Sequence, residues 1–208
     1  MRDAEMLKRS RLVTSVVVVG LYLMAGSALA EQQTQAPFGL SWGASTSEVR
    51  ALGVDLKPMP DDETGKRFIA TSLPKVLADI EMVVLQFGYR DRLWRVAAVS
   101  KSYENDPYGS AILARYDELS GLLASKYGTG SQHHHRGDSL YSEPQYFIAG
   151  IRGGESWHYT DFSKDGTGVQ LSIRAQRSDA AYYLLSYVNE TLENEVTREQ
   201  AAKESDAL

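Results

Sequence analysis

The clearest periodic pattern of the chain lies between residues 106 and 128. Apolar side chains recur there at steps of four, three, four and four, at Ile112, Tyr116, Leu119, Leu123 and Tyr127. This spacing places them along one side of an α-helix. Asp106 suits the N-cap, Pro107 suits the first helical position, and Gly128 suits the end. We therefore predict a helix over this segment with one buried side.

Several other segments have the composition or alternation of β-strands. Residues 93–102 are apolar on both faces, which predicts a central place in a sheet. The alternation in 157–162 and 169–174, with a turn at 164–166, predicts a hairpin. The remaining predicted strands are 68–72, 80–87 and 181–188.

Residues 181–188 also fit a helical spacing, so this segment could be strand or helix. We favour a strand to about Val188 and then a helix over 190–204. Near the start, Ser45 and Glu48 fit a capping box, which predicts a helix of about two turns before Gly53. Residues 54–66 and 129–155 are predicted to be loops because Pro, Gly and polar residues are frequent there.

These elements follow the order helix, three strands, helix, three strands, helix. The order predicts an α+β fold with two pseudo-halves, at about 38–103 and 106–188. Each half would be an α-β-β-β unit contributing to one antiparallel sheet. Helices would pack on one face of that sheet, with the helix over 190–204 at the C-terminus.

The first thirty residues have the pattern of a secretory signal peptide. A basic head containing Lys8 and Arg9 precedes an apolar run over 12–24, and Ala28-Leu29-Ala30 forms an A-x-A cleavage site. We predict cleavage after Ala30, which makes 31–208 a single exported domain in the periplasm or outside the cell. The alternative is an uncleaved segment that anchors the protein in the inner membrane.

Composition narrows the possible partners and chemistry. The chain has 22 basic and 27 acidic residues, and removing residues 1–30 changes the net charge from −5 to −7. An acidic domain argues against nucleic acid as a partner, and no stable membrane insertion is expected after cleavage. The chain contains no Cys, so disulfides, thiol catalysis and thiolate metal sites are excluded.

The segment after the signal resembles a known group of proteins. Its residues Phe38-Gly39-Leu40, Trp42-Gly43, Ser45, Glu48-Val49 and Leu52-Gly53 form an FGLxWGxSxxEVxxLG opening. This opening resembles that of small exported bacterial proteins of unassigned function, which also contain a hairpin like 87–96. The resemblance implies an exported α+β protein and assigns no catalytic residue.

Histidines are the most obvious candidates for chemistry. His133, His134 and His135 could bind a metal ion, but adjacent side chains seldom converge on one ion, so we favour a solvated loop. Asp138 and Glu143 are the nearest carboxylates. His158 and Asp161 lie an odd number of residues apart on one strand, so they point to opposite faces and cannot pair. We expect His158 to cap the sheet or face solvent.

Other motifs have simple structural explanations. We interpret Gly150, Gly153 and Gly154 as a flexible loop, Asp61 to Glu63 as a solvated acidic turn, and Arg136-Gly137-Asp138 as a turn. Of the three tryptophans, we expect Trp94 and Trp157 in the core. Trp42, which has glycines nearby, is equally compatible with exposure.

Together these features favour a non-enzymatic module that binds a protein or an envelope component, with an inhibitor-like or immunity-like role as one form of it. The expected contact regions are 129–155 and the exposed face of the sheet. One alternative is a hydrolase with a dispersed active site around His158. Another is a weak metal binder using His133–His135. No cofactor is expected, and no catalytic residue or metal ligand is assigned.

Overall fold

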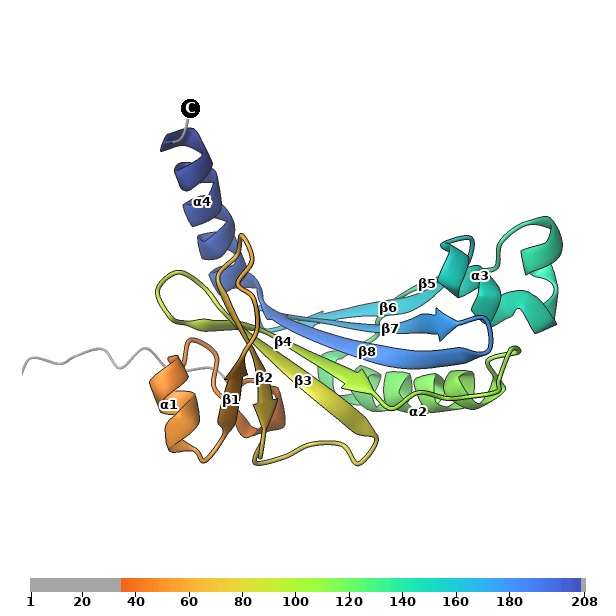
Figure 1. Cartoon of the computed structure of the whole chain (residues 1–208), viewed down its shortest axis with the longest axis horizontal. Coiled ribbons are helices and arrows are strands. Elements are labelled where there is room, and N and C mark those ends of the chain that lie inside the picture. Colours follow the sequence, from red (N-terminus) through yellow and green to blue (C-terminus); the bar gives the residue numbers. More distant parts are fainter. Residues whose placement is uncertain (1–34, 207–208) are drawn as a thin grey trace, which may run out of the picture. The chain divides into compact units, whose positions relative to one another are not determined.

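The computed structural model describes residues 35–206, which form an eight-stranded antiparallel sheet with helices (Figure 1). The predicted signal peptide and its cleavage site lie outside the described residues, so they stay predictions. No helix within 35–206 combines the length and apolar character needed to cross a bilayer.

The strands follow the sheet order β1-β2-β3-β4-β8-β7-β6-β5. They are β1 (Asp55–Pro58), β2 (Lys66–Thr71), β3 (Ile80–Phe87), β4 (Leu93–Ser100), β5 (Ser131–His135), β6 (Trp157–Lys164), β7 (Thr167–Arg177) and β8 (Ala180–Asn189). The helices are α1 (Thr46–Ala51), α2 (Ser110–Tyr127), α3 (Phe147–Gly153) and α4 (Glu190–Asp206), with 3₁₀ turns at Pro37–Gly39, Ser139–Ser142 and Pro144–Tyr146.

Each half of the sheet is a helix followed by a four-stranded meander. Helix α1 precedes β1 to β4, and α2 precedes β5 to β8, with α3 inserted after β5. The two meanders join through their last strands, because β4 pairs antiparallel with β8. The α+β class, the antiparallel sheet and the C-terminal helix are confirmed. The predicted three strands per half are wrong, since each half has four.

The missing strand of each half lies in a segment that we predicted to be a loop. Strand β1 falls within 54–66, while β5 and α3 fall within 129–155. Both strands are sheet edges with mostly exposed side chains, so neither needs the apolar alternation that marks a buried strand. Helix α3 escaped prediction because three glycines, at 150, 153 and 154, lie in or next to it.

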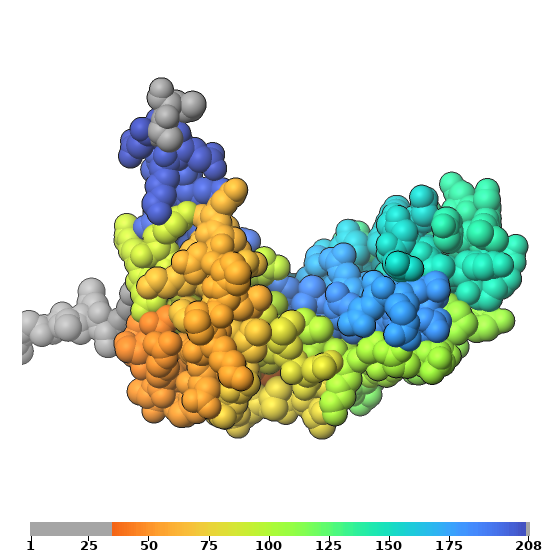
Figure 2. Space-filling model, in the orientation of Figure 1, coloured from red at the N-terminus to blue at the C-terminus, as the bar shows by residue number. Residues whose placement is uncertain are grey.

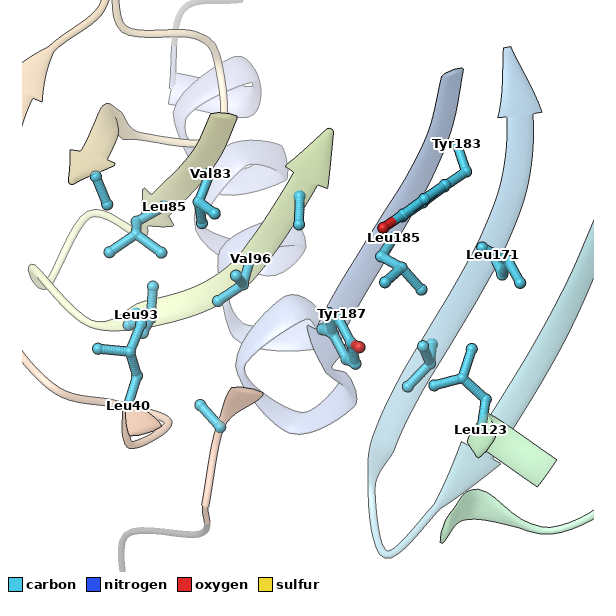
Figure 3. Close-up of a cluster of buried hydrophobic side chains, with 14 of the residues drawn as sticks. Leu40, Val83, Leu85, Leu93, Val96, Leu123, Leu171, Tyr183, Leu185 and Tyr187 are labelled. Carbon is cyan, nitrogen blue, oxygen red and sulfur yellow. The ribbon is translucent and has the colours of Figure 1, made fainter. Parts of the chain in front are cut away.

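The core lies on one face of the sheet, under α2 and the segment 36–54 (Figure 3). Alternate residues of β3, β4, β7 and β8 point into it, among them Val83, Leu85, Val96, Leu171, Tyr183, Leu185 and Tyr187. Helix α2 adds the predicted stripe of Ile112, Tyr116, Leu119 and Leu123. Leu40 and Val49 bury the N-terminal segment against the first half.

Helix boundaries follow the local capping chemistry. At α1, Ser45 and Glu48 form the predicted capping box. Helix α2 begins at Ser110, later than predicted, because Gly109 takes the N-cap position with a φ of 71°. Asp106 still caps this end, since its carboxylate accepts hydrogen bonds from the N–H groups of Ser110 and Ala111.

Candidate functional site

Helix α4 packs beside Gly88 and Trp94 at one end of the sheet. Away from that end, the face of the sheet opposite the core carries half-exposed side chains. In β2, β3, β4 and β8, alternate residues point away from the core, and most of them are half-exposed, whereas Gln86 and Ser186 are buried. We call this surface the open face. The strand register decides which residues belong to the open face, because directly paired residues of neighbouring strands point to the same side.

An apolar row crosses the open face over the first half of the sheet and reaches β8. Ile69 pairs with Val84 and Val84 with Ala97, while Met82 pairs with Val99 and Val99 with Leu184. All six side chains are half-exposed. A contiguous apolar patch of this kind is typical of an interaction surface, whereas isolated exposed apolar residues are not.

Basic side chains surround this apolar row. Lys57 on β1, Arg67 on β2, Arg95 on β4 and Arg174 on β7 occupy open-face positions by register. Arg95 also donates a hydrogen bond to Ser186 Oγ at 3.2 Å. Basic side chains therefore outnumber acidic ones beside the apolar row, although Asp62 pairs with Arg67 and Asp55 lies on the same face.

The side of β7 and β8 away from α2 is hollowed between α4 and the 139–153 segment (Figure 2). Toward β6 the open face becomes polar. Gln170 donates a hydrogen bond to Asp161 Oδ1 at 2.9 Å, and Asp161 Oδ2 lies 3.6 Å from His133 Nε2. The surface thus combines an apolar part and a polar part on one sheet.

At the far edge of the sheet, the three consecutive histidines of β5 stack on side chains of β6. The ring pairs are His133 with Tyr159 at 4.7 Å, His134 with His158 at 3.6 Å, and His135 with Trp157 at 4.1 Å between centroids. Their interplanar angles are 16°, 10° and 28°. We call these three pairs the histidine ladder. It exists because each β5 histidine lies directly opposite its partner in the strand register.

The middle pair of the ladder lies on the core side of the sheet. The ring of Tyr116 meets His158 edge-on at 4.5 Å, and its hydroxyl hydrogen-bonds Thr160 Oγ1 at 2.6 Å. Burial, helped by His134 and Arg136, lowers the pKa of His158 to about 4. Burial also lowers the pKa of His134 and raises that of Tyr116 to about 12. All three groups are therefore uncharged at neutral pH.

These positions correct two of our predictions about histidine. His133–His135 form an edge strand and not a loop, and His158 is a half-buried member of a ring stack and not a solvent-facing cap. The predicted separation of His158 from Asp161 is confirmed, because Asp161 points to the open face beside His133.

The arrangement of the histidine side chains gives little support to the metal-binding and hydrolase alternatives. His134 points to the core side and its two neighbours to the open face, so the three rings diverge. Within residues 35–206, no group of three His, Asp or Glu side chains is placed to hold a metal ion. His158 Nε2 is buried and has no hydrogen-bond partner among these residues.

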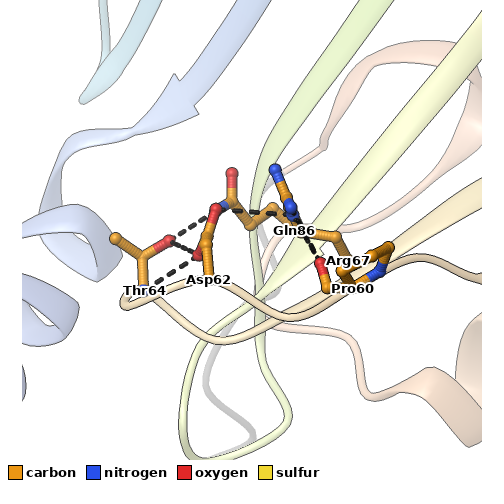
Figure 4. A network of polar contacts seen from close by, with 5 residues as sticks. All are labelled: Pro60, Asp62, Thr64, Arg67 and Gln86. Carbon is orange, nitrogen blue, oxygen red and sulfur yellow. Dashed lines mark hydrogen bonds and ion pairs between the residues drawn. The ribbon is translucent and has the colours of Figure 1, made fainter.

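The acidic segment 61–63 is an ordered turn that Asp62 organises (Figure 4). Asp62 accepts hydrogen bonds from the Thr64 N–H at 2.9 Å and from Gln86 Nε2 at 3.0 Å. Arg67 lies 3.5 Å from the same carboxylate and donates to the carbonyl of Pro60. Burial opposes ionisation, but these hydrogen bonds and Arg67 hold the pKa of Asp62 below its usual value. The network fixes a turn and leaves no set of carboxylates for a calcium ion.

The remaining candidates also have structural roles. Gly150 and Gly153 belong to α3, and Gly154 ends it, so the predicted flexible loop is wrong. Gly137 is buried, with its N–H donating to Ser156 Oγ at 3.0 Å. Arg136 lies over the ring of Phe147. Asp138 is the N-cap of the 3₁₀ turn at Ser139, and Glu143 precedes the next one.

The tryptophans are only partly as predicted. Trp94 is buried, as expected. Trp42 is also buried, with 2% of its surface exposed, whereas Trp157 is 45% exposed on the open face. The prediction that Trp157 lies in the core is wrong because its position alternates with His158, which takes the core side.

Sequence reasoning also missed an ion pair that connects the two halves. Arg115 of α2 donates to both carboxylate oxygens of Asp79, at 2.8 and 3.0 Å. The polar position of Arg115 on a predicted helix was visible, but its partner lies 36 residues away. Only the fold brings the two together.

Comparisons with known proteins do not identify a family for this chain. No protein-family model matches the chain, and neither a curated protein nor a solved structure matches it. The resemblance of the 38–53 opening to small exported bacterial proteins therefore stays a prediction.

Proposed function

We propose that this chain is an exported, non-enzymatic binding module whose open face docks a protein partner. The observation that carries the proposal is the apolar row of Ile69, Met82, Val84, Ala97, Val99 and Leu184. A sheet face that stays apolar without a covering helix loses water-exposed apolar surface when a partner binds. A rigid sheet also presents this surface without a large ordering cost.

The charges around the row define the chemistry of the partner. Lys57, Arg95 and Arg174 form a basic surround in an otherwise acidic chain, and Arg67 beside them pairs with Asp62. The complementary surface has an apolar centre and acidic side chains at its rim. An inhibitor or immunity protein that covers an acidic region of an enzyme would have this kind of face.

Site-specific photo-crosslinking in the producing cell tests the proposal. A photoreactive phenylalanine analogue replaces Ala97 on the open face or, as a matched control, Leu122 on the exposed side of α2. Because the full chain is expressed, export takes its natural course. We expect a discrete crosslinked protein from position 97 and not from position 122. The crosslinking from position 97 is then repeated in a chain that also carries Val99→Glu, because the added acidic side chain would repel the partner's acidic rim.

The identified partner is then purified and titrated against the purified chain by calorimetry. We expect Val99→Glu to weaken binding by about 100-fold or more, since it buries an unpaired charge, and Leu122→Glu to leave binding unchanged. Absence of a discrete crosslink at position 97, or equal binding by the two variants, would contradict docking on the open face. Crosslinks to lipid alone would also contradict it.

A further inference from the structure

The two edges of the sheet differ in how well they are protected against strand addition. Edge strand β1 reads Asp55-Leu56-Lys57-Pro58, and charges and proline are the common means of blocking an edge. Edge strand β5 reads Ser131-Gln132-His133-His134-His135 and contains neither proline, lysine nor carboxylate. Gln132, His133 and His134 are exposed. The unprotected edge is therefore the one with the histidine ladder.

The histidine ladder also favours the addition of a strand that carries planar side chains. Each β5 imidazole stacks one ring face on β6, at centroid distances of 3.6 to 4.7 Å. The opposite ring faces are turned toward the position that a ninth strand would take. Neighbouring strands lie about 4.8 Å apart, so planar side chains on an added strand would continue the stacks.

We propose that β5 pairs with β5 of a second copy of this chain, with a two-fold axis at His134. The pairing is antiparallel, and His134 of one copy lies opposite His134 of the other. In this register His133 of each copy lies opposite His135 of the other. A second copy fits this edge because its β5 supplies three planar rings at matching positions and contains no lysine, arginine or carboxylate.

The two-fold register makes the ladder continuous on both faces of the joined sheet. On the core side, four imidazoles stack in the order His158, His134, His134 and His158. On the open face, each stack runs from Tyr159 through His133 to His135 and Trp157 of the other copy. Such an interface is isologous, so it closes at a dimer. It also places both open faces on the same side, although it does not depend on what they bind.

Sedimentation velocity of the purified chain in EDTA tests the proposal. The contact is small compared with standard interfaces of roughly 1,600 Å², so we expect a dissociation constant between about 10 μM and 1 mM. Two matched variants test the register. In H133K/H135D, the introduced lysine of one copy faces the introduced aspartate of the other, whereas in H133K/H135K lysine faces lysine. Both remove the same two rings, and circular dichroism checks that both fold.

We expect H133K/H135D to dimerise with an affinity that added salt weakens, and H133K/H135K to bind at least about tenfold more weakly. A monomeric wild type at about 1 mM and pH 8 would overturn the proposal. Equal association of the two variants, or dimers that form only without EDTA, would overturn it as well.

Discussion

At the scale of single residues, the stacked ring of His158 should make folding stability depend on pH. Burial and its neighbours lower its pKa to about 4 in the folded protein, while an unfolded histidine has a pKa near 6.5. The unfolded chain therefore binds this proton first. The contribution of His158 is complete above about pH 6.5 and is lost as the pH falls toward 4.

The substitution His158→Phe tests this linkage because phenylalanine keeps a planar ring under His134 and does not titrate. Urea unfolding of dilute protein, at which any dimer is dissociated, gives the free energy of unfolding at each pH. Between pH 6.5 and 4.5, we expect the wild type to lose about 2 kcal/mol more than the variant. Parallel losses in the two proteins would show that His158 is not the group responsible.

Single residues also show what a local pattern cannot predict. Trp42 was equally compatible with exposure in the sequence, yet it is buried, and Trp157 was expected in the core, yet it is exposed. A tryptophan has similar local signals in both places. Its burial depends on which strand or helix covers it, which is decided by residues far away in the chain.

At the scale of secondary structure, the turn between β1 and β2 depends on Gly65. Its φ is 126°, and a Cβ at this position would clash with the carbonyl oxygen of Phe87. Gly53, after α1, also has a positive φ of 83° but has open space around it. Gly65→Ala therefore combines backbone strain with a backbone clash, whereas Gly53→Ala has only the strain.

We expect Gly65→Ala to lower the free energy of unfolding by about 3 kcal/mol and Gly53→Ala by about 1 kcal/mol. Chemical denaturation of the two variants measures the difference. The amide exchange of Gln86, whose side chain binds Asp62 of this turn, should also speed up only in Gly65→Ala. Equal destabilisation by the two substitutions would contradict a specific role of the Phe87 contact.

The same scale separates the elements that the sequence predicted from those that it did not. Strands β3 and β4 and helices α2 and α4 were predicted because burial forces a periodic apolar pattern on them. Strands β1 and β5 are edges, and their exposed side chains carry no such constraint. The histidine ladder was missed for this reason, since its stacking depends on a strand that has no strand-like pattern.

At the scale of the whole molecule, the two halves share one sheet and one core. The β4–β8 pairing joins the sheet, and Tyr187 of β8 contacts Phe38 at 6.0 Å and Tyr127 at 6.5 Å between ring centroids. Two similar element orders were visible in the sequence. The way in which the halves join was not, because β4 and β8 pair across a long stretch of chain, with Arg95 and Ser186 in contact 91 residues apart.

The ion pair between Asp79 and Arg115 is a polar contact between the two halves. Asp79 lies just before β3, and Arg115 lies on α2 of the other half. Both side chains are mostly buried, with 26% and 22% of their surface exposed. Burial alone would raise the pKa of Asp79, but hydrogen bonds from Arg115 hold it below its usual value. Removing either partner leaves the other charge poorly solvated.

A double-mutant cycle with Asp79→Asn and Arg115→Met measures how strongly this pair couples the halves. We expect each single variant to lower the free energy of unfolding by about 2 kcal/mol and the double variant by less than the sum, with a coupling of about 1 kcal/mol or more. The exposed pair of Arg177 and Glu104 serves as the control, and its removal should leave stability unchanged. Additive losses for Asp79 and Arg115 would instead mean that the sheet and core hold the halves together without this ion pair.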